Sequence, residues 1–392
     1  MNLHLKNIKF FIKETIKRST KGAKLLWHSR GIIWFLNKKR GFRSAYNFIW
    51  VKLFVKEAGP AVMNPLYSIF PSLAPYPTQI EVEATTRCHL KCAICERSYW
   101  KEKPDDMSFD NFLKLVNQFP RLKWVGFAGI GSNFLNQNYI KMMKYLKDKN
   151  VYVSFVDHFD RTTADISKEI VAIGVDQIEI SMDGATKETY EKIKVGTNFE
   201  RSIKNISDMV KIKKELGSPL PQLMFRYIVT KQNIGEAPDF IKIVSKIKEN
   251  GQLRDDGYAE IEFTGLLAFK ENESYALDLF PQDIKEKIVS EAKKYGIIVS
   301  FAHQNPKHKR PRHSCAAWVE PFIFVDGEVM ACCAQNENNS REIQRKRSLG
   351  NLFKTPFKKI WNSDKYKQLR KNVPRKGAPA PEWCQGCRMT DI

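Results

Sequence analysis

Between Gln79 and Thr264 the chain alternates between short apolar runs rich in β-branched residues and longer stretches in which apolar residues recur at helical spacing. Because consecutive strands separated by helices must run parallel, the alternation predicts an α/β fold, a partial (β/α)6 TIM-like barrel. The predicted strands are Gln79–Glu83, Trp124–Ala128, Tyr152–Val156, Gln177–Met182, Leu223–Val229 and Glu260–Thr264. The predicted helices are Phe109–Phe119, capped by Ser108, and Tyr139–Lys149, Ala164–Ile173, Thr186–Ile193, Phe199–Leu216 and Glu236–Lys248.

The first 58 residues are strongly basic, with 14 Lys or Arg and two acidic residues in a chain of formal net charge +22. Residues 5–16 have apolar side chains at helical spacing and lysines on another face, and Trp27, Trp34 and Trp50 are interleaved with basic residues. No run reaches the roughly 20 apolar residues that span a bilayer. The pattern favours amphipathic helices on an anionic membrane surface. Packing of this arm on the barrel and binding of single-stranded RNA are the alternatives.

Three domains are predicted from these shifts in composition. A Pro-punctuated linker, Gly59–Pro77, separates the basic arm from the barrel. We predict a helical arm and linker at 1–76, the barrel at 77–300, and a small cysteine-rich domain of β-hairpin and helices at 301–392. Eight cysteines near possible cluster sites and no secretory apolar region favour a reducing cytoplasm, with the protein peripheral at the inner face of the membrane.

A loop with three thiols follows the first predicted strand. Cys88, Cys92 and Cys95 have the spacing CxxxCxxC, and their odd number excludes complete disulfide pairing. Three thiolates can hold three irons of a 4Fe-4S cluster and leave the fourth iron open to a ligand. The C-terminal ends of barrel strands are where catalytic groups gather, and this loop lies at such an end. A three-thiol zinc site and three incidental core cysteines are the alternatives.

The CxxxCxxC loop after the first strand resembles that of the radical S-adenosylmethionine (radical SAM) family. The turn GIGSNFLNQ after the second strand resembles the family's glycine-rich turn, with Ser132 in place of the usual acidic residue. ISMDGATKETYEKIK after the fourth strand resembles the segment near the cofactor ribose, although an ordinary strand-to-helix turn fits too. The resemblance implies S-adenosylmethionine contacts at Gly129, Gly131, Ser132, Ser181, Asp183 and Arg226. Arg226 would meet the cofactor carboxylate, and a structural acidic partner is equally able to satisfy it.

The remaining five cysteines gather in the C-terminal region. A hairpin is predicted at Phe322–Val325 and Glu328–Ala331, turned by Asp326 and Gly327. The order of the cysteines resembles the SPASM/twitch extension of radical SAM enzymes, which implies one auxiliary 4Fe-4S cluster. Its predicted ligands are Cys315, Cys332, Cys384 and Cys387, with Cys333 spare, and the reverse choice between Cys332 and Cys333 stays open. A structural zinc site with four cysteine ligands is the alternative.

The resemblance implies reductive cleavage of S-adenosylmethionine at the first cluster and hydrogen abstraction from an unactivated C–H bond, with no catalytic residue assigned beyond the cluster. A reductant such as ferredoxin or flavodoxin is implied. The basic arm favours a membrane-associated substrate, a lipid or lipid-linked glycan. A radical SAM peptide maturase that crosslinks or oxidises a ribosomal peptide is one alternative. A non-catalytic, metal-stabilised RNA-binding protein is another, although the charge lies in the arm and nucleic acid is not favoured.

Overall fold

The structure is a computed structural model that describes residues 66–251, 260–267, 269–302, 317–333 and 341–372. Within these residues the chain forms one nine-stranded sheet with the strand order β7-β6-β5-β4-β3-β2-β1-β8-β9. Neighbouring strands are parallel except for the antiparallel pair β8 and β9. The strands are β1 (Gln79–Val82), β2 (Trp124–Phe127), β3 (Tyr152–Asp157), β4 (Gln177–Ser181), β5 (Gln222–Val229), β6 (Glu260–Gly265), β7 (Ile298–Ala302), β8 (Phe322–Ile323) and β9 (Val329–Met330).

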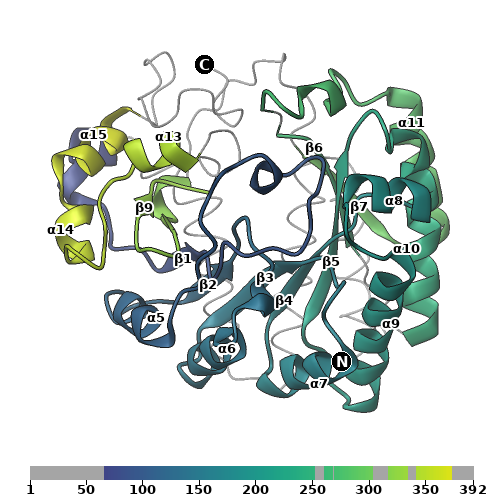
Figure 1. The fold of residues 1–392 in the computed structure, drawn as a ribbon, viewed down its shortest axis with the longest axis horizontal. Coiled ribbons are helices and arrows are strands. Elements are labelled where there is room, and N and C mark those ends of the chain that lie inside the picture. The colour runs from purple at the N-terminus through teal and green to yellow at the C-terminus, as the bar shows by residue number, and fades with distance from the viewer. Residues whose placement is uncertain (1–65, 252–259, 268, 303–316, 334–340, 373–392) are drawn as a thin grey trace, which may run out of the picture.

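Helices cover the outer side of the curved sheet (Figure 1). Helices α13 to α15 lie beside β8 and β9, at the edge of the sheet opposite β7. Local capping fixes where several of them begin. Ser108 accepts a hydrogen bond from the backbone N–H of Asn111 at 3.2 Å, which confirms the predicted cap, and Thr163 and Thr186 begin their helices in the same way. The helices are α5 (Phe109–Val116), α6 (Tyr139–Asp148), α7 (Ala164–Ile173), α8 (Lys187–Ile193), α9 (Phe199–Glu215), α10 (Ala237–Gly251), α11 (Gln282–Lys294), α13 (Arg341–Lys346), α14 (Phe357–Trp361) and α15 (Asp364–Asn372).

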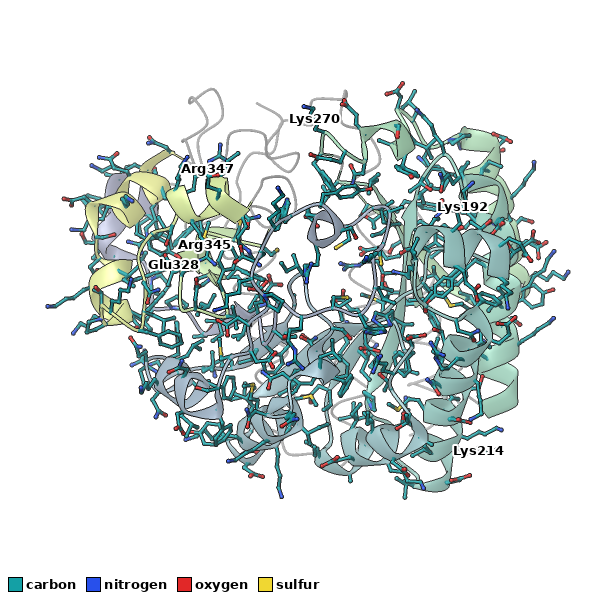
Figure 2. The ribbon with its side chains drawn as sticks, viewed as in Figure 1. Lys192, Lys214, Lys270, Glu328, Arg345 and Arg347 are labelled. Carbon is teal, nitrogen blue, oxygen red and sulfur yellow. The ribbon has the colours of Figure 1, made fainter. Side chains whose placement is uncertain are left out.

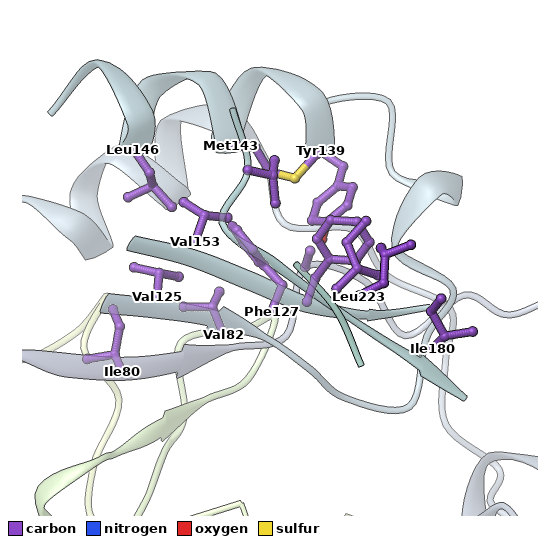
Figure 3. Close-up of a cluster of buried hydrophobic side chains, with 14 of the residues drawn as sticks. Ile80, Val82, Val125, Phe127, Tyr139, Met143, Leu146, Val153, Ile180 and Leu223 are labelled. Carbon is purple, nitrogen blue, oxygen red and sulfur yellow. The ribbon is translucent and has the colours of Figure 1, made fainter. Parts of the chain in front are cut away.

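The hydrophobic core lies between the sheet and these helices. Val82, Val125 and Phe127 point to this side of their strands and are fully buried. Met143 and Leu146 of α6 lie over them (Figure 3). Each side chain of this kind stabilises the fold by about 1.5–3 kcal/mol relative to an exposed position. Because side chains alternate along a strand, this packing turns the other residues of each strand toward the inner face of the partial barrel.

The structure extends the predicted barrel at both edges. β7 pairs in parallel with β6 and spans the boundary that we predicted between residues 300 and 301. The predicted C-terminal hairpin does not form a sheet of its own, because β8 pairs in parallel with β1, with Val82 opposite Ile323. This pairing satisfies backbone groups of β1 that would otherwise form an open sheet edge.

The basic arm and most of the predicted linker, residues 1–65, lie outside the described residues. In the part of the chain that the structure describes, no helix is both long and apolar enough to cross a membrane.

Candidate cluster and cofactor site

The three-thiol loop connects β1 to α5 and lies near the middle of the view in Figure 1. Each of the three residues Cys88, Cys92 and Cys95 is partly exposed to solvent. A 3₁₀ turn follows directly at Glu96–Ser98. Burial raises the pKa of the Cys92 thiol to about 11, although the positive charge of Lys194 acts to lower that pKa. Burial also raises the pKa of Cys95 well above its ordinary value. Without a bound metal these thiols are therefore protonated at neutral pH.

The glycine turn packs directly against the start of this loop. The backbone N–H of Ser132 donates to the carbonyl of Arg87, the residue before the first cysteine, at 2.8 Å. A Cβ atom on Gly131 would lie 2.1 Å from the carbonyl oxygen of Thr85. Gly129 has φ +134°, and a Cβ atom there would lie 2.8 Å from Cγ of Glu83. The two motifs are therefore in contact, and glycine is required where the backbones approach most closely.

The Gly131→Ala variant is expected to bind less iron and to melt at a lower temperature, because the added methyl group cannot fit against the backbone of Thr85. We expect a loss of about 1–3 kcal/mol in the free energy of unfolding. Iron content after reconstitution and thermal unfolding measure the effect. The matched control is Gly235→Ala, where nothing lies within 4 Å of the added Cβ atom. Equal iron content and melting temperature in the two variants would contradict the proposed role of this contact.

The end of α8 supports the loop from another side. The backbone N–H of Lys91 donates to the carbonyl of Val195, and that of Ala93 donates to the carbonyl of Ile193, each at 2.8 Å. These two bonds place Cys92 opposite Lys194. Lys194 is not among the site residues predicted from the sequence. The sequence offers no local signal that this lysine is buried, since Ile193 before it is buried but Val195 after it is 45% exposed.

Ser181 and Asp183, predicted near the cofactor ribose, both contact Lys194. Its Nζ atom lies 2.7 Å from Oδ2 of Asp183 and donates to Oγ of Ser181 at 2.9 Å. The other oxygen of Asp183 accepts a hydrogen bond from the backbone N–H of Ile228 at 2.8 Å. The structure thus brings the two predicted residues together beside the cysteine loop. Their contact with the cofactor stays a prediction.

Arg226 lies on the inner face of β5 between two carboxylates. Its Nη2 atom is 2.8 Å from Oε2 of Glu179 on β4 and 3.0 Å from Oε2 of Glu262 on β6. The acidic partner that we considered as the alternative is therefore present, and a contact with the cofactor carboxylate stays a prediction. The three side chains are 22–34% exposed, so this charged part of the inner face is open to solvent.

A buried carboxylate that the sequence analysis missed also holds the cysteine loop. Oδ2 of Asp160 lies 2.8 Å from Nε2 of His89, the residue after Cys88, and its other oxygen accepts from Thr197 at 3.0 Å and from Arg201. Burial opposes ionisation of Asp160, but the hydrogen bonds from Arg201 and His89 outweigh it and lower its pKa to about 2. The charged carboxylate thereby joins the loop to the start of α9.

A second missed contact joins the cysteine loop to the C-terminal region. Nη2 of Arg341, on α13, lies 2.5 Å from Oε1 of Glu83, at the end of β1. Both side chains are at most 3% exposed. The guanidinium of Arg341 also stacks on Phe324, 3.9 Å from the ring centre, with Trp100 of the loop at 5.6 Å. The sequence offers no local signal for this pair, because 258 residues separate its members.

The structure describes only part of the predicted auxiliary site. Cys315, Cys384 and Cys387 lie outside the described residues. Cys333 packs against the apolar cluster of Phe322, Phe324 and Met330. Cys332 lies close enough to Tyr366 of α15 to raise the pKa of that phenol, in addition to the effect of burial. The two adjacent cysteines therefore have different surroundings, and the choice between them as ligand stays open.

The donor set of the first loop suits an iron–sulfur cluster. In addition to the effect of burial, Cys88 raises the pKa of Cys92, and both Cys92 and Cys88 raise the pKa of Cys95, so the three thiols lie near one another. In the described residues no three His, Cys, Asp or Glu side chains already converge on one metal position. Sulfur donors select iron–sulfur clusters or zinc, and three rather than four in one loop suit a cluster with one open iron.

Comparisons with known proteins give two family matches and several distant relatives. Residues 82–244 match the family model "Radical SAM superfamily", and residues 315–388 match SPASM, an "Iron-sulfur cluster-binding domain". The tungsten-containing aldehyde ferredoxin oxidoreductase cofactor-modifying protein of Pyrococcus furiosus is 27% identical over 179 residues, 44% of this chain and 49% of that protein. The mycofactocin maturase MftC of Mycobacterium tuberculosis is 20% identical over 166 residues, 42% of this chain and 41% of that protein. The chain thus matches half or less of the length of these relatives.

The fold is similar to that of SuiB from Streptococcus suis, whose crystal structure was determined with the precursor peptide SuiA bound. The TM-score is 0.58 at 11% sequence identity, and the match covers 84% of this chain and 73% of SuiB. The family matches imply a catalytic 4Fe-4S cluster, S-adenosylmethionine and an auxiliary cluster. They also favour an enzyme over the non-catalytic RNA-binding alternative. The chain belongs to the radical SAM superfamily and carries a C-terminal SPASM iron–sulfur cluster-binding domain.

Proposed function

We propose that this protein is a radical SAM enzyme that modifies a peptide. The observation that carries the reaction class is the loop of Cys88, Cys92 and Cys95, held against the glycine turn at the C-terminal end of β1. Two comparisons support a peptide as the substrate, because MftC is named a maturase and SuiB was crystallised with a precursor peptide. The lipid substrate that the basic arm favoured has no support of this kind.

The inner face of the barrel also supports a polar substrate. Glu179, Arg226 and Glu262 lie on that face and are partly open to solvent. An acyl chain packed against these groups would remove them from water without offering hydrogen bonds in return, which costs several kcal/mol. A peptide brings its own amide donors and acceptors to such a surface. The alternative in the sequence analysis, a radical SAM peptide maturase, therefore fits better than an acyl-lipid substrate.

The roles proposed for the residues follow from their positions. When bound, the cluster and S-adenosylmethionine supply a 5'-deoxyadenosyl radical that removes hydrogen from an unactivated C–H bond. Cys88, Cys92 and Cys95 would hold that cluster, and the Gly129 to Ser132 turn, Ser181, Asp183 and Arg226 are the proposed cofactor contacts. The protein's part is to orient the substrate carbon and to exclude water around it. Cys315, Cys332, Cys384 and Cys387 are the proposed auxiliary ligands.

The formation of 5'-deoxyadenosine by full-length, anaerobically reconstituted protein given S-adenosylmethionine and dithionite tests the proposal. Reactions receive a peptide fraction from cells of the source organism, the same fraction after protease digestion, or a lipid extract. We expect stimulation by the peptide fraction and its loss after digestion. Stimulation by the lipid extract alone would overturn the peptide assignment. No product from protein with full iron and sulfide loading would overturn the reaction class.

We also propose that the protein associates peripherally with an anionic membrane, as the basic arm predicts. The segment directly after the arm presents Ile69, Phe70 and Leu73 at 54–63% exposure, which is unusual for large apolar side chains. Pelleting with vesicles in the reactions above measures the association. We expect binding to phosphatidylglycerol vesicles and not to phosphatidylcholine vesicles. Equal recovery in both pellets would contradict an electrostatic contribution from the arm.

A further inference from the structure

The buried ion pair of Lys194 and Asp183 lies beside the middle cysteine of the loop. Hydrogen bonds from Lys91 to Val195 and from Ala93 to Ile193 flank the pair of residues Cys92 and Lys194, which therefore face each other. We propose that the Lys194–Asp183 pair sets the reduction potential of the cluster held by the three cysteines. This inference rests on the proposed cluster ligands.

Lys194 is placed and charged as this role requires. The residue is 6% exposed, and its ammonium group contacts Asp183 and Ser181 at 2.7 and 2.9 Å. Burial works against its charge, but the carboxylate of Asp183, 2.7 Å from Nζ, outweighs burial and raises the pKa of Lys194 above its ordinary value. The lysine is therefore cationic at neutral pH. Because the surroundings are buried, its field is screened less than that of a surface lysine.

Asp183 is fixed more firmly than its partner, which keeps the pair in one orientation. It is fully buried, its Oδ1 accepts from the backbone N–H of Ile228, and its carbonyl accepts from Nδ2 of Asn233 at 2.9 Å. Asn233 in turn accepts from the backbone N–H of Thr230 at 2.7 Å. The carboxylate is therefore anchored on β5 and the following turn. Lys194 is the member of the pair that lies toward the cysteine loop, because its backbone is opposite that of Cys92.

The two charges have opposite effects on a neighbouring cluster. Reduction adds one negative charge to the cluster, and net charge near a cluster is one of the factors that set its potential. A cation at Lys194 stabilises the reduced form, whereas the anion at Asp183 destabilises it. Removing the lysine charge should therefore make the potential more negative, and removing the aspartate charge should make it more positive. A purely structural role would not produce shifts of opposite sign.

A redox titration monitored by electron paramagnetic resonance tests this inference on the full-length reconstituted protein without S-adenosylmethionine. The signal that is missing in Cys92→Ala identifies the cluster of the first loop. We expect a more negative potential in Lys194→Met, a more positive one in Asp183→Asn, and a value near that of the unmodified protein in the double variant. The matched control is Lys192→Met, an exposed lysine at the end of α8 (Figure 2), which should leave the potential unchanged.

Lys194→Arg keeps the test decisive if Lys194→Met loses its cluster, because the arginine retains the charge and should retain the potential. Shifts of the same sign in Lys194→Met and Asp183→Asn, no shift in either of these variants at full iron content, or a clear shift in Lys194→Arg would overturn the inference. Weaker binding of S-adenosylmethionine in Lys194→Met with an unchanged potential would also overturn it, because the lysine would then serve the cofactor. An unmodified protein that forms no cluster at these cysteines would instead overturn the proposed function.

Discussion

The Cys92→Ala variant is expected to form no 5'-deoxyadenosine above background, while its fold is retained. Cys92 is the middle thiol of the loop, and its neighbours on both sides are fixed by hydrogen bonds to the end of α8. Removing it leaves two thiols, which are too few to hold a cluster with one open iron. The loop itself keeps its backbone contacts, so the methyl group should be accommodated. Product formation and iron content per chain measure the effect, and iron should fall by about four atoms.

The matched control for this prediction is Cys384→Ala, which removes a proposed ligand of the auxiliary site and leaves the first loop intact. It should also lose iron but continue to form 5'-deoxyadenosine. Two results would contradict the division of the cysteines between two clusters. One is full formation of 5'-deoxyadenosine by Cys92→Ala, and the other is complete loss of 5'-deoxyadenosine formation in Cys384→Ala while Cys92→Ala stays active. The same pair of variants separates loss of chemistry from loss of folding, since both can be compared by circular dichroism.

The Arg341→Met variant is expected to lose about 3–5 kcal/mol of stability, because it leaves the buried carboxylate of Glu83 without its cation. Burial already raises the pKa of Glu83, and the guanidinium is the main opposing influence. Glu83 also accepts a hydrogen bond from the backbone N–H of Ile130 in the glycine turn at 3.5 Å. The cysteine loop and the glycine turn should therefore loosen together. Chemical denaturation and iron content measure the two effects.

Arg345→Met is the matched control for Arg341→Met, since it lies four residues along α13 and pairs with Glu102 and Asp326 at 39% exposure (Figure 2). An exposed pair of this kind is worth about 0–1 kcal/mol. The double variant Glu83→Gln and Arg341→Met should recover part of the loss, because no uncompensated charge remains. Equal stability of Arg341→Met and Arg345→Met would contradict the buried pair's role in joining the C-terminal region to the barrel.

The comparisons changed the expected substrate more than the expected chemistry. The cysteine spacing led to the radical SAM family, and the family models match both the barrel and the C-terminal region. The prediction of a lipid substrate was based on the composition of the arm. That composition indicates which surfaces the arm can contact, but not which substrate the active site accepts. The charged inner face around Arg226 is a property of the site itself, and it favours a polar substrate.

The sequence by itself determined the elements of the barrel and the position of the cysteine loop. Apolar periodicity and local caps located all six predicted strands and the helices between them, because these signals depend on residues close together in the chain. The spacing of Cys88, Cys92 and Cys95 is likewise local. Helix ends differ by a few residues, as at α5, which ends at Val116 and not at the predicted Phe119.

Only the tertiary structure decided how distant residues meet at the site. The pairing of β8 with β1 and the burial of Glu83 with Arg341 join residues that sequence spacing does not relate. The partner of Arg226 was also undecided from the sequence. A buried guanidinium needs an anion, and the sequence could not distinguish an acidic side chain from a bound carboxylate. A buried charge demands a partner, and the curvature of the sheet and the packing of its helices determine which partner is within reach.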